Sequence, residues 1–310
     1  MRKYATWVCE TALLLTIIVA VGLASAEGAA RDIVIMVTPS LDLAASPAGV
    51  PYPASEVIKT VEWAPPATIV RKACDSDNWP VTWADDDNLY TAYGDGWGFD
   101  PRVDTKLSLG FARIVGGPEH FKGVNIRSET GERLGQDVSG AKASGVLCVD
   151  GILYMLVRNV GNSQIVWSDD HALAWHWCDW KFQTSFGAPT FLNFGRNYAG
   201  KRDDFVYVHS HDSDSAYSPA DRMVLARVPL DRIRDRKAYE FLRSVDAAGR
   251  PEWTGDIRRR GAVFVNTGRC FRSGISVKAG RPWRWLSVSQ ASCPRFEGGT
   301  PSTRPSPSCA

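Results

Sequence analysis

Three copies of one short sequence pattern constrain the fold of this chain more than any other feature. Each copy starts with an Asp-containing turn and continues into apolar residues that include a Tyr, as in 87–90, 150–154 and 203–207. Asp-Asn and Asp-Gly pairs tolerate positive φ angles, so they favour tight turns between antiparallel strands. The copies recur about every 50–65 residues, which indicates a repeated structural unit.

Apolar segments flank every copy of the pattern. The preceding segments are 80–83, 143–147 and 189–192, and the following segments are 107–115, 164–167 and 223–228. A unit of three or four antiparallel strands that repeats in this way is typical of a β-propeller blade. We therefore predict an all-β fold of the propeller type, with an irregular β-sandwich as the alternative.

The composition agrees with a β-rich globular protein. The chain has 310 residues, of which 44% are hydrophobic and 23% charged. Its 12 Trp, 27 Gly and 18 Pro favour turns and aromatic clefts over a helical bundle. The formal net charge of +2 is too small to attract the phosphate backbone of a nucleic acid strongly, so no nucleic-acid partner is expected.

The segment 168–175 resembles the Asp-box of sialidase-like propellers. Ser168, Asp170 and Trp175 match that motif, whereas Ala172 and Ala174 replace its usual Gly and Thr. The resemblance implies that the Asp170 carboxylate accepts hydrogen bonds from turn amides and that Trp175 packs between blades. We therefore interpret Asp170 as structural and not catalytic.

The first 26 residues have the three parts of a secretory signal peptide. Arg2 and Lys3 form a basic start, 12–24 is an apolar run, and 24–26 are small residues suited to cleavage. The apolar run is shorter than the roughly 20 residues that span a bilayer. We expect a secreted or periplasmic protein with no membrane partner after cleavage, and an uncleaved anchor is the alternative.

The cysteines are compatible with export. Of the seven cysteines, Cys9 falls in the predicted signal. An exported chain permits disulfides among the others, whose pairing the sequence leaves open. No C-x-x-C motif occurs, so neither a zinc ribbon nor a thioredoxin-type redox site is indicated. The remaining six are Cys74, Cys148, Cys178, Cys270, Cys293 and Cys309.

The rest of the chain divides by composition. We expect a lead-in segment over 27–54, a propeller domain over 55–285 and an irregular Pro/Ser-rich tail over 286–310. Within the propeller, good helix formers after Asp231, a suitable N-cap, predict one helix over 232–242.

The densest group of candidate functional residues lies between 75 and 100, where carboxylates alternate with Trp and Gly. Indole rings stack on the apolar faces of sugars, and a carboxylate pair can cleave a glycosidic bond by acid–base chemistry. Asp77 and Asp95 are candidate catalytic residues, and Trp79 and Trp97 are candidate sugar platforms. The run 85–87 precedes a hairpin, and we interpret its carboxylates as turn formers.

A second polar group directly follows the third copy of the pattern. In a strand, His209 and His211 would share one face, while Asp212 and Asp214 would share the other. Asp214 is a further catalytic candidate, and His211, Asp212 and Arg222 are candidate substrate-binding residues. No metal is predicted, because the spacing fixes no third ligand. A hydrogen-bonded loop is the alternative.

Two cations precede inner strands at equivalent places in different repeats. Lys142 stands before a run of small residues, and Arg272 lies between small residues in 268–274. Either side chain could hold a carboxylate or sugar hydroxyls, so both are predicted to bind substrate. The nearby serines lack a nucleophile-elbow motif, so a serine-hydrolase triad is not expected.

Four separated motifs resemble the exported bacterial domain-of-unknown-function 4185 family. They are 77–85, 93–99, 210–217 and 221–229, and the resemblance covers about residues 55–285. It implies a five-bladed β-propeller related to glycoside hydrolases, some relatives of which cleave D-arabinan. It also implies a pocket on the propeller axis with acids from different blades. On that analogy Asp77 is a first-blade carboxylate, and Asp214 or Asp95 is its partner.

The chain departs from that pattern after 285, where three repeats and the start of a fourth have passed. We therefore expect a propeller that is incomplete at its C-terminus, unless 33–70 supplies the missing strands. The favoured function is an exported glycoside hydrolase that acts on a polysaccharide through paired carboxylates. The alternatives are a non-catalytic carbohydrate-binding propeller and an inactive truncated family member. No cofactor is expected, and a structural calcium is not indicated.

Overall fold

The computed structural model describes residues 60, 62–73, 75–265, 275–277 and 286–288. The predicted signal (1–26) and the predicted lead-in (27–54) therefore lie outside the described residues. The chain divides into two compact units, Met1–Thr68 and Ile69–Ala310. In the first unit the described residues include a short 3-10 helix, η1 (Pro66–Thr68). All the described strands belong to the second unit.

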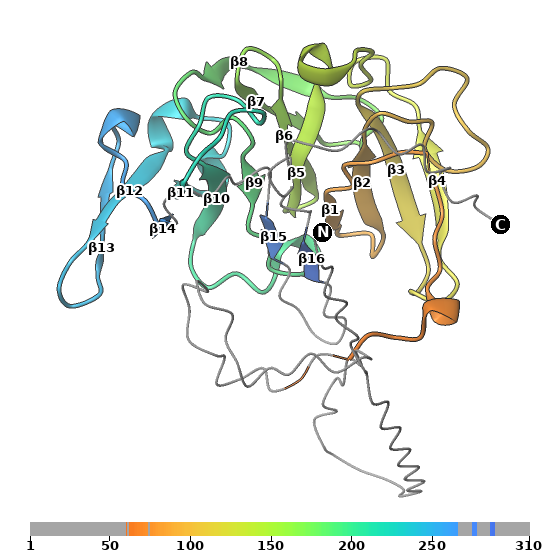
Figure 1. The fold of residues 1–310 in the computed structure, drawn as a ribbon, viewed down its shortest axis with the longest axis horizontal. Helices are drawn as coiled ribbons and strands as arrows, with labels where there is room; N and C mark the ends of the chain where they lie inside the picture. Colours follow the sequence, from red (N-terminus) through yellow and green to blue (C-terminus); the bar gives the residue numbers. More distant parts are fainter. Residues whose placement is uncertain (1–59, 61, 74, 266–274, 278–285, 289–310) are drawn as a thin grey trace, which may run out of the picture. The chain divides into compact units, whose positions relative to one another are not determined.

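The first sheet contains four antiparallel strands in chain order (Figure 1). They are β1 (Val81–Trp83), β2 (Leu89–Tyr93), β3 (Gly110–Val115) and β4 (Lys122–Ile126). The run 85–87 forms the β1–β2 turn, as predicted. Asp87 has a φ of 69°, and the Asp86 carboxylate accepts a hydrogen bond from the Asn88 amide at 3.1 Å.

The second sheet repeats this four-stranded arrangement. Its strands are β5 (Lys142–Val149), β6 (Ile152–Arg158), β7 (Ser163–Ser168) and β8 (His176–Phe182). Asp150 and Gly151 form the β5–β6 turn with φ angles of 50° and 77°. The Asp-Gly pair thus supplies the positive φ angles that a tight hairpin requires.

The third sheet has the strand order β13–β12–β11–β10–β9, and β14 also pairs with β11. A separate ladder joins β15 to β16, which occupies the first residues of the segment predicted to be irregular. In this ladder Ile275 pairs with Val288, and the domain boundaries stay predictions. The strands are β9 (Thr190–Phe191), β10 (Phe205–His211), β11 (Arg222–Pro229), β12 (Glu240–Val245), β13 (Pro251–Thr254), β14 (Phe264–Val265), β15 (Ile275–Val277) and β16 (Leu286–Val288).

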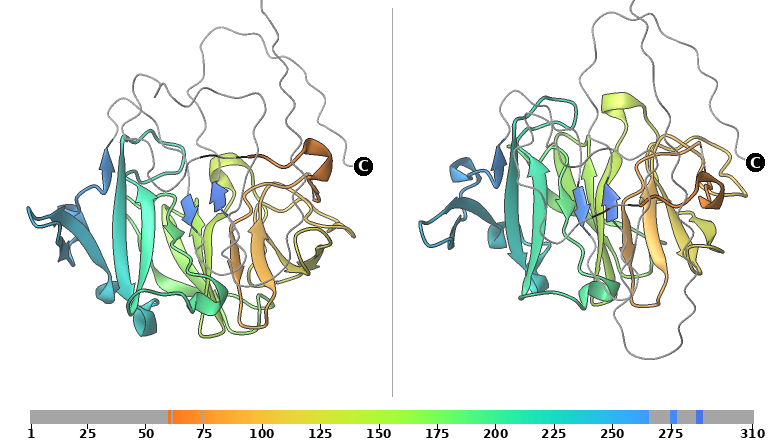
Figure 2. Two further views of the ribbon diagram at one scale, coloured as in Figure 1. Left: turned by 90° about the horizontal axis from the view of Figure 1, so that it is seen from below. Right: turned by 60° about the horizontal axis from the view of Figure 1, so that its bottom comes forward.

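The three sequence repeats coincide with the three sheets. Each copy of the pattern forms the second strand of its sheet, β2, β6 or β10, and the flanking apolar segments form the first and third strands. The first strands are neighbours, since β1 contacts β5 and β5 contacts β9. Figure 2 shows the three sheets side by side. The all-β class and the blade-like repeats are confirmed, whereas five blades remain a prediction.

A buried polar network ties β1 and β5 to the segment that follows β9. The Thr82 hydroxyl donates to the Asn193 side chain (3.0 Å) and accepts from the Cys148 amide (2.9 Å). The Asn193 amide group donates to the Val146 carbonyl (3.2 Å). Gly145 permits the close approach of β9, because a Cβ there would lie 2.8 Å from the Thr190 Cα.

Apolar clusters lie between neighbouring sheets. One combines side chains of the first and second sheets, including Phe111 and Leu153. Another combines the second and third sheets, including Phe182, Val208 and Phe241. The first, second and third sheets therefore share apolar cores with their neighbours.

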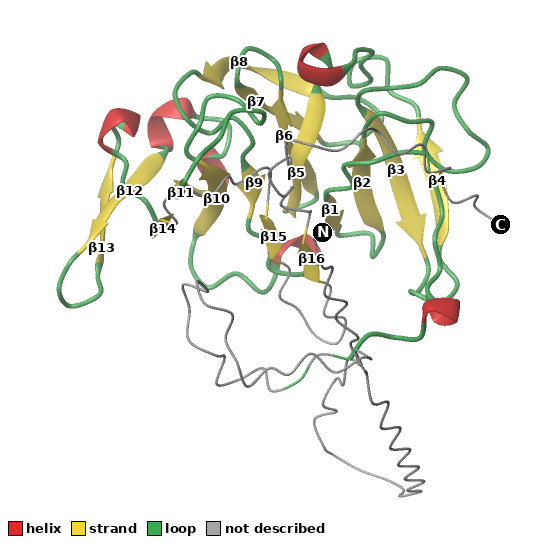
Figure 3. Ribbon diagram, in the orientation of Figure 1, coloured by secondary structure: helices red, strands yellow, loops and turns green. Residues whose placement is uncertain are grey.

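The helix predicted over 232–242 is wrong (Figure 3). Two 3-10 turns, η4 (Leu230–Arg232) and η5 (Arg236–Ala238), lead directly into β12. The Asp235 side chain caps η5 by accepting from the Lys237 amide. Phe241 is buried by pairing with β11, so tertiary packing overrides the local preference for helix.

The other helices are also single 3-10 turns. They are η2 (Asp137–Ser139), η3 (Arg196–Tyr198) and η6 (Ile257–Arg259). None of the helices in the described part of the chain has the length and apolar character that a membrane crossing requires.

Two of the six cysteines of the predicted mature chain are described, and both are free thiols. Burial raises the pKa of Cys148 to about 12 and that of Cys178 to about 11. Both thiols are therefore protonated at neutral pH and poorly nucleophilic. The other four, Cys74, Cys270, Cys293 and Cys309, lie outside the described residues.

The Asp-box-like segment closes the turn between β7 and β8. The Asp170 carboxylate accepts from the Ser168 hydroxyl (2.8 Å) and from the Ala174 amide (2.9 Å). Although burial opposes it, these hydrogen bonds lower the pKa of Asp170. Trp175 stacks on Phe111 of the first sheet with ring centroids 5.0 Å apart. The structural interpretation of this motif is confirmed.

Candidate functional site

Asp77 and Asp95 flank one backbone bridge at an end of the first sheet. The Asp77 amide donates to the Gly94 carbonyl (2.8 Å), and the Gly94 amide donates to the Asp77 carbonyl (2.7 Å). This bridge lies beyond the start of β1 and the end of β2. It places Asp95 one residue after the bridge partner of Asp77. The fold therefore brings these two predicted catalytic carboxylates to the same end of the sheet.

The two carboxyl groups have different electrostatic surroundings. Burial raises the pKa of Asp77, and the negative charge of Asp95 raises it further, while Lys142, the Asn78 hydrogen bond and the charge of Arg158 oppose the rise. Asp95 is ion-paired with Lys142, whose Nζ lies 2.5 Å from Asp95 Oδ2. Asp77 is exposed, so its carboxyl group is accessible to a ligand.

An amide side chain links Asp77 to a buried arginine. Arg158 Nη2 donates to Asn78 Oδ1 (3.1 Å), and Asn78 Nδ2 donates to Asp77 Oδ1 (2.7 Å). The guanidinium donor and the Asp77 Oδ1 acceptor thus fix which way the amide points. Asn78 holds this place with a φ of 52°, a left-handed conformation that Asn tolerates better than most residues.

Sequence reasoning missed both Asn78 and Arg158. The available signal for Arg158 was a charged residue at the end of the apolar run that forms β6. The signal for Asn78 was its position next to Asp77. Neither signal reveals the contact, because the two residues are 80 positions apart in the sequence.

Trp79 and Trp97 lie beside the carboxylates but pack into an apolar cluster. The Trp79 ring is 5.4 Å from that of Tyr93 and 5.3 Å from that of Phe99, and its Nε1 donates to Ser76 O at 3.2 Å. Both indoles are partly buried against this cluster. Their packing role is therefore established, and a role as sugar platforms stays a prediction.

His211 reaches the same region from β10. It is buried, and its Nε2 lies 2.9 Å from the Ser215 carbonyl. Because a carbonyl only accepts, Nε2 carries the proton of the neutral ring. Burial lowers the pKa of His211, and the charge of nearby Arg158 adds to this effect. The guanidinium of Arg158 also lies 5.8 Å from the Tyr217 ring centroid.

The remaining residues of the second predicted polar group have partners elsewhere in the protein. Asp212 accepts from Arg260 Nε at 2.8 Å, and its other oxygen lies 3.5 Å from Arg222 Nη2. The Asp214 carboxylate accepts from the Ser185 amide. Among the described residues, no contact joins Asp214 to Asp77 or Asp95. Arg272, the last predicted binding residue, lies outside the described residues.

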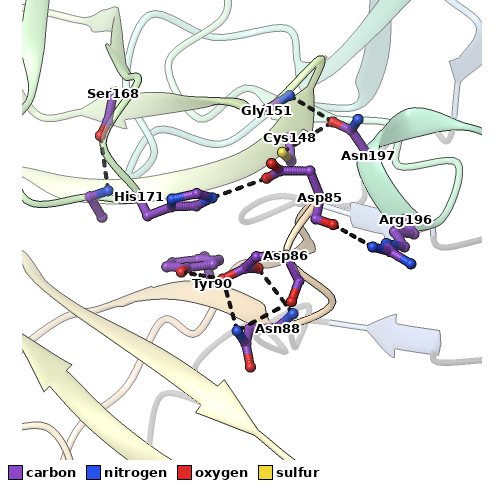
Figure 4. Close-up of polar contacts among 11 residues, drawn as sticks. Asp85, Asp86, Asn88, Tyr90, Cys148, Gly151, Ser168, His171, Arg196 and Asn197 are labelled. Carbon is purple, nitrogen blue, oxygen red and sulfur yellow. Dashed lines mark hydrogen bonds and ion pairs between the residues drawn. The ribbon is translucent and has the colours of Figure 1, made fainter.

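A set of metal-type donors lies at the seam between the first and second sheets (Figure 4). Donor atoms of Asp85, Asp86 and His171 all lie within 4.8 Å of one another. They already have protein partners, since His171 Nε2 is 3.0 Å from Asp85 Oδ1 and the Tyr90 hydroxyl donates to Asp86 at 2.8 Å. These contacts give the set a structural role in joining two sheets.

Comparison with known proteins yields structural likeness alone. No protein-family model matches the chain, and no curated protein matches it. Ten chains of solved structures are similar to this chain. Three of them are a Bacteroides ovatus protein thought to be a hydrolase (12% identity, TM-score 0.41), the endosialidase of phage phi92 (14%, 0.35) and a GH43_1 enzyme from Xanthomonas citri (12%, 0.35).

The likeness is partial for all three structures. It covers 68%, 66% and 67% of this chain, respectively, and 63%, 29% and 66% of the other chains. The chain thus spans less than two thirds of each of these proteins. At such identities and TM-scores, the likeness assigns no activity to this chain.

Proposed function

We propose that this protein is an exported glycoside hydrolase that cleaves a polysaccharide with Asp77 and Asp95. The observation that carries the proposal is the unlike environment of the two carboxyls. Burial and Asp95 raise the pKa of Asp77, whereas Asp95 is ion-paired with Lys142. Glycoside hydrolysis uses such a division, with one carboxyl as proton donor and another as base or nucleophile.

In the proposed reaction Asp77 protonates the glycosidic oxygen as the bond to the anomeric carbon breaks. Asp95 removes a proton from the attacking water or attacks the anomeric carbon itself. Water supplies the hydroxyl of the new reducing end in both routes. If Asp95 is the base, it takes the water proton, which returns to Asp77 through solvent. If Asp95 is the nucleophile, water then displaces it from the anomeric carbon, and Asp77 takes the water proton and is protonated again. The Asn78 hydrogen bond occupies Oδ1 of Asp77, which favours Oδ2 as the oxygen that carries the proton.

The wider context supports this proposal from the sequence. The 4185-family resemblance implies a five-bladed propeller, and the N-terminal pattern implies export to the periplasm or beyond. Carbohydrate is the partner that both features favour. Asp214 is the weaker catalytic candidate, because its carboxylate holds the backbone of Ser185.

The test is release of reducing ends from a polysaccharide panel that includes D-arabinan. We expect Asp77→Asn and Asp95→Asn each to lower the rate by about 10²- to 10⁴-fold, the range for loss of general acid–base catalysis. Asp104→Asn is the matched control, because Asp104 is exposed in the β2–β3 connection and should leave the rate unchanged.

The same panel separates the proposal from a carbohydrate-binding role. Binding without release, unaltered by Asp77→Asn, would identify a non-catalytic binding propeller. If reducing ends are still released by both Asp77→Asn and Asp95→Asn at the unaltered rate, other residues carry out the cleavage.

A further inference from the structure

Two buried cations face each other across β5 and β6. Lys142 and Arg158 are register partners, so their side chains leave the sheet on the same face. Their exposed fractions are 2% and 8%. Like charges in opposite positions are destabilising, and a buried charge costs free energy unless it is paired. These cations therefore require anions nearby.

The fold supplies a carboxylate partner to Lys142 alone. Lys142 forms the ion pair with Asp95 at 2.5 Å. Within the described ranges, no carboxylate forms an ion pair with Arg158. Its direct contacts are the neutral Asn78 oxygen and Tyr217, while the charges of Asp77 and Asp95 act on it without forming an ion pair. A guanidinium has five N–H donors, so several remain for another acceptor.

Asp77 does not fill this place. Its pKa is raised by burial and by Asp95, so it holds a proton more readily than an ordinary aspartate. The Asn78 amide also stands between Asp77 and Arg158. Among the described residues, the Arg158 guanidinium therefore has no carboxylate in direct contact, and its remaining N–H donors are left for a ligand oxyanion.

We propose that Arg158 binds an oxyanion of the substrate, a carboxylate or sulfate carried by an acidic sugar unit. This inference rests on the proposed function and narrows its substrate class to acidic polysaccharides. The planar fork of a guanidinium matches two oxygens of such a group, which a lysine cannot do. Arg158 is thus a specificity residue beside the carboxylates that carry out the cleavage.

The test compares affinities of the full chain for matched polymers by isothermal titration calorimetry. Polygalacturonate is compared with its carboxyl-reduced form, and a sulfated galactan with its desulfated form. We expect one acidic polymer to bind about 10- to 100-fold more tightly than its neutral match, the effect of one charged hydrogen-bonded contact. A preference for polygalacturonate identifies the bound group as a carboxylate, and a preference for the sulfated galactan identifies it as a sulfate.

Two arginine variants test whether Arg158 causes the preference for the acidic polymer. Arg158→Gln should remove it, whereas Arg243→Gln should retain it, because Arg243 is exposed on β12 and carries the same charge. Equal affinity of the unaltered protein for acidic and neutral polymers overturns the inference, even if Arg158→Gln fails to fold. An equal loss in Arg243→Gln also overturns it, because it would show non-specific attraction.

These outcomes remain distinct from those for the proposed function. An acidic preference without cleavage supports the Arg158 site and contradicts the hydrolase. Cleavage of a neutral polymer bound as tightly as its acidic match supports the hydrolase and contradicts the Arg158 site.

Discussion

The surroundings of Asp77 favour its protonated form at the expense of stability at neutral pH. A carboxyl whose pKa is higher in the folded chain stabilises the fold below its ordinary value of 3.8, and this contribution is lost as the pH rises through the raised value. We therefore expect Asp77→Asn to raise the melting temperature at pH 7 and to change it little near about pH 3. Differential scanning calorimetry measures both.

Asp77→Asn is expected to raise the melting temperature because the new side chain keeps the Oδ1 acceptor for Asn78 and removes the charge. Asp104→Asn, an exposed carboxylate, should show no comparable gain. A lower melting temperature for Asp77→Asn at pH 7 would mean that the charge of Asp77 stabilises the fold. Such a result would also remove the electrostatic basis for Asp77 as a proton donor.

At this scale, the sequence predicted residue types better than contacts. Alternation of Asp, Trp and Gly led to Asp77 and Asp95, which the fold brings together. It could not reveal Arg158, because that position is defined by the β5–β6 register and by Asn78. It also selected Asp214, whose catalytic role stays a prediction, and it did not reveal that the Asp214 carboxylate accepts from the Ser185 amide.

At the scale of the strand, β10 carries two histidines with lowered pKa values. Burial lowers the pKa of His209 and of His211; Arg158 opposes the protonation of His211 and Asp212 favours it. The unfolded chain binds protons at these positions below its ordinary value of 6.5, so folded stability falls as the pH drops from there towards the lowered values.

We expect His211→Gln to weaken this acid sensitivity by at most about 1.4 kcal/mol per pH unit, the linkage for one proton. Gln is chosen because its amide can still donate to Ser215. Urea unfolding at several pH values between about 7.5 and 5.5 measures the slope. His120→Gln, at an exposed position, should keep the slope of the unaltered protein. An unchanged slope in His211→Gln would contradict the prediction.

Strand prediction succeeded where turns and apolar runs agreed, as in β2, β6 and β10. It failed at 232–242, where local propensity favoured helix. There, pairing of Phe241 with Ala226 of β11 and burial of Tyr239 determine the structure. That information comes from a neighbouring strand, so the segment itself does not contain it.

At the scale of the whole second unit, the seams between sheets determine stability. Trp175 is 4% exposed, stacks on Phe111 and has its backbone amide bound by Thr130 Oγ1 at 2.6 Å. Gly131 leaves the room for this stack, because a Cβ there would lie 2.3 Å from the Trp175 ring. Since the apolar clusters span adjacent sheets, we expect the sheets to unfold together.

Trp175→Ala should therefore lower the free energy of unfolding by about 3–5 kcal/mol while the protein keeps one transition. Urea unfolding followed by both circular dichroism and tryptophan fluorescence measures this, and the two probes should give coincident midpoints. Trp63→Ala is the control, because that indole is 66% exposed and its loss should have little effect. Two separate transitions, or a loss below about 1 kcal/mol, would mean that the first and second sheets are stabilised independently. In that case the Asp85–His171 contact and the shared apolar cluster would be insufficient to couple them.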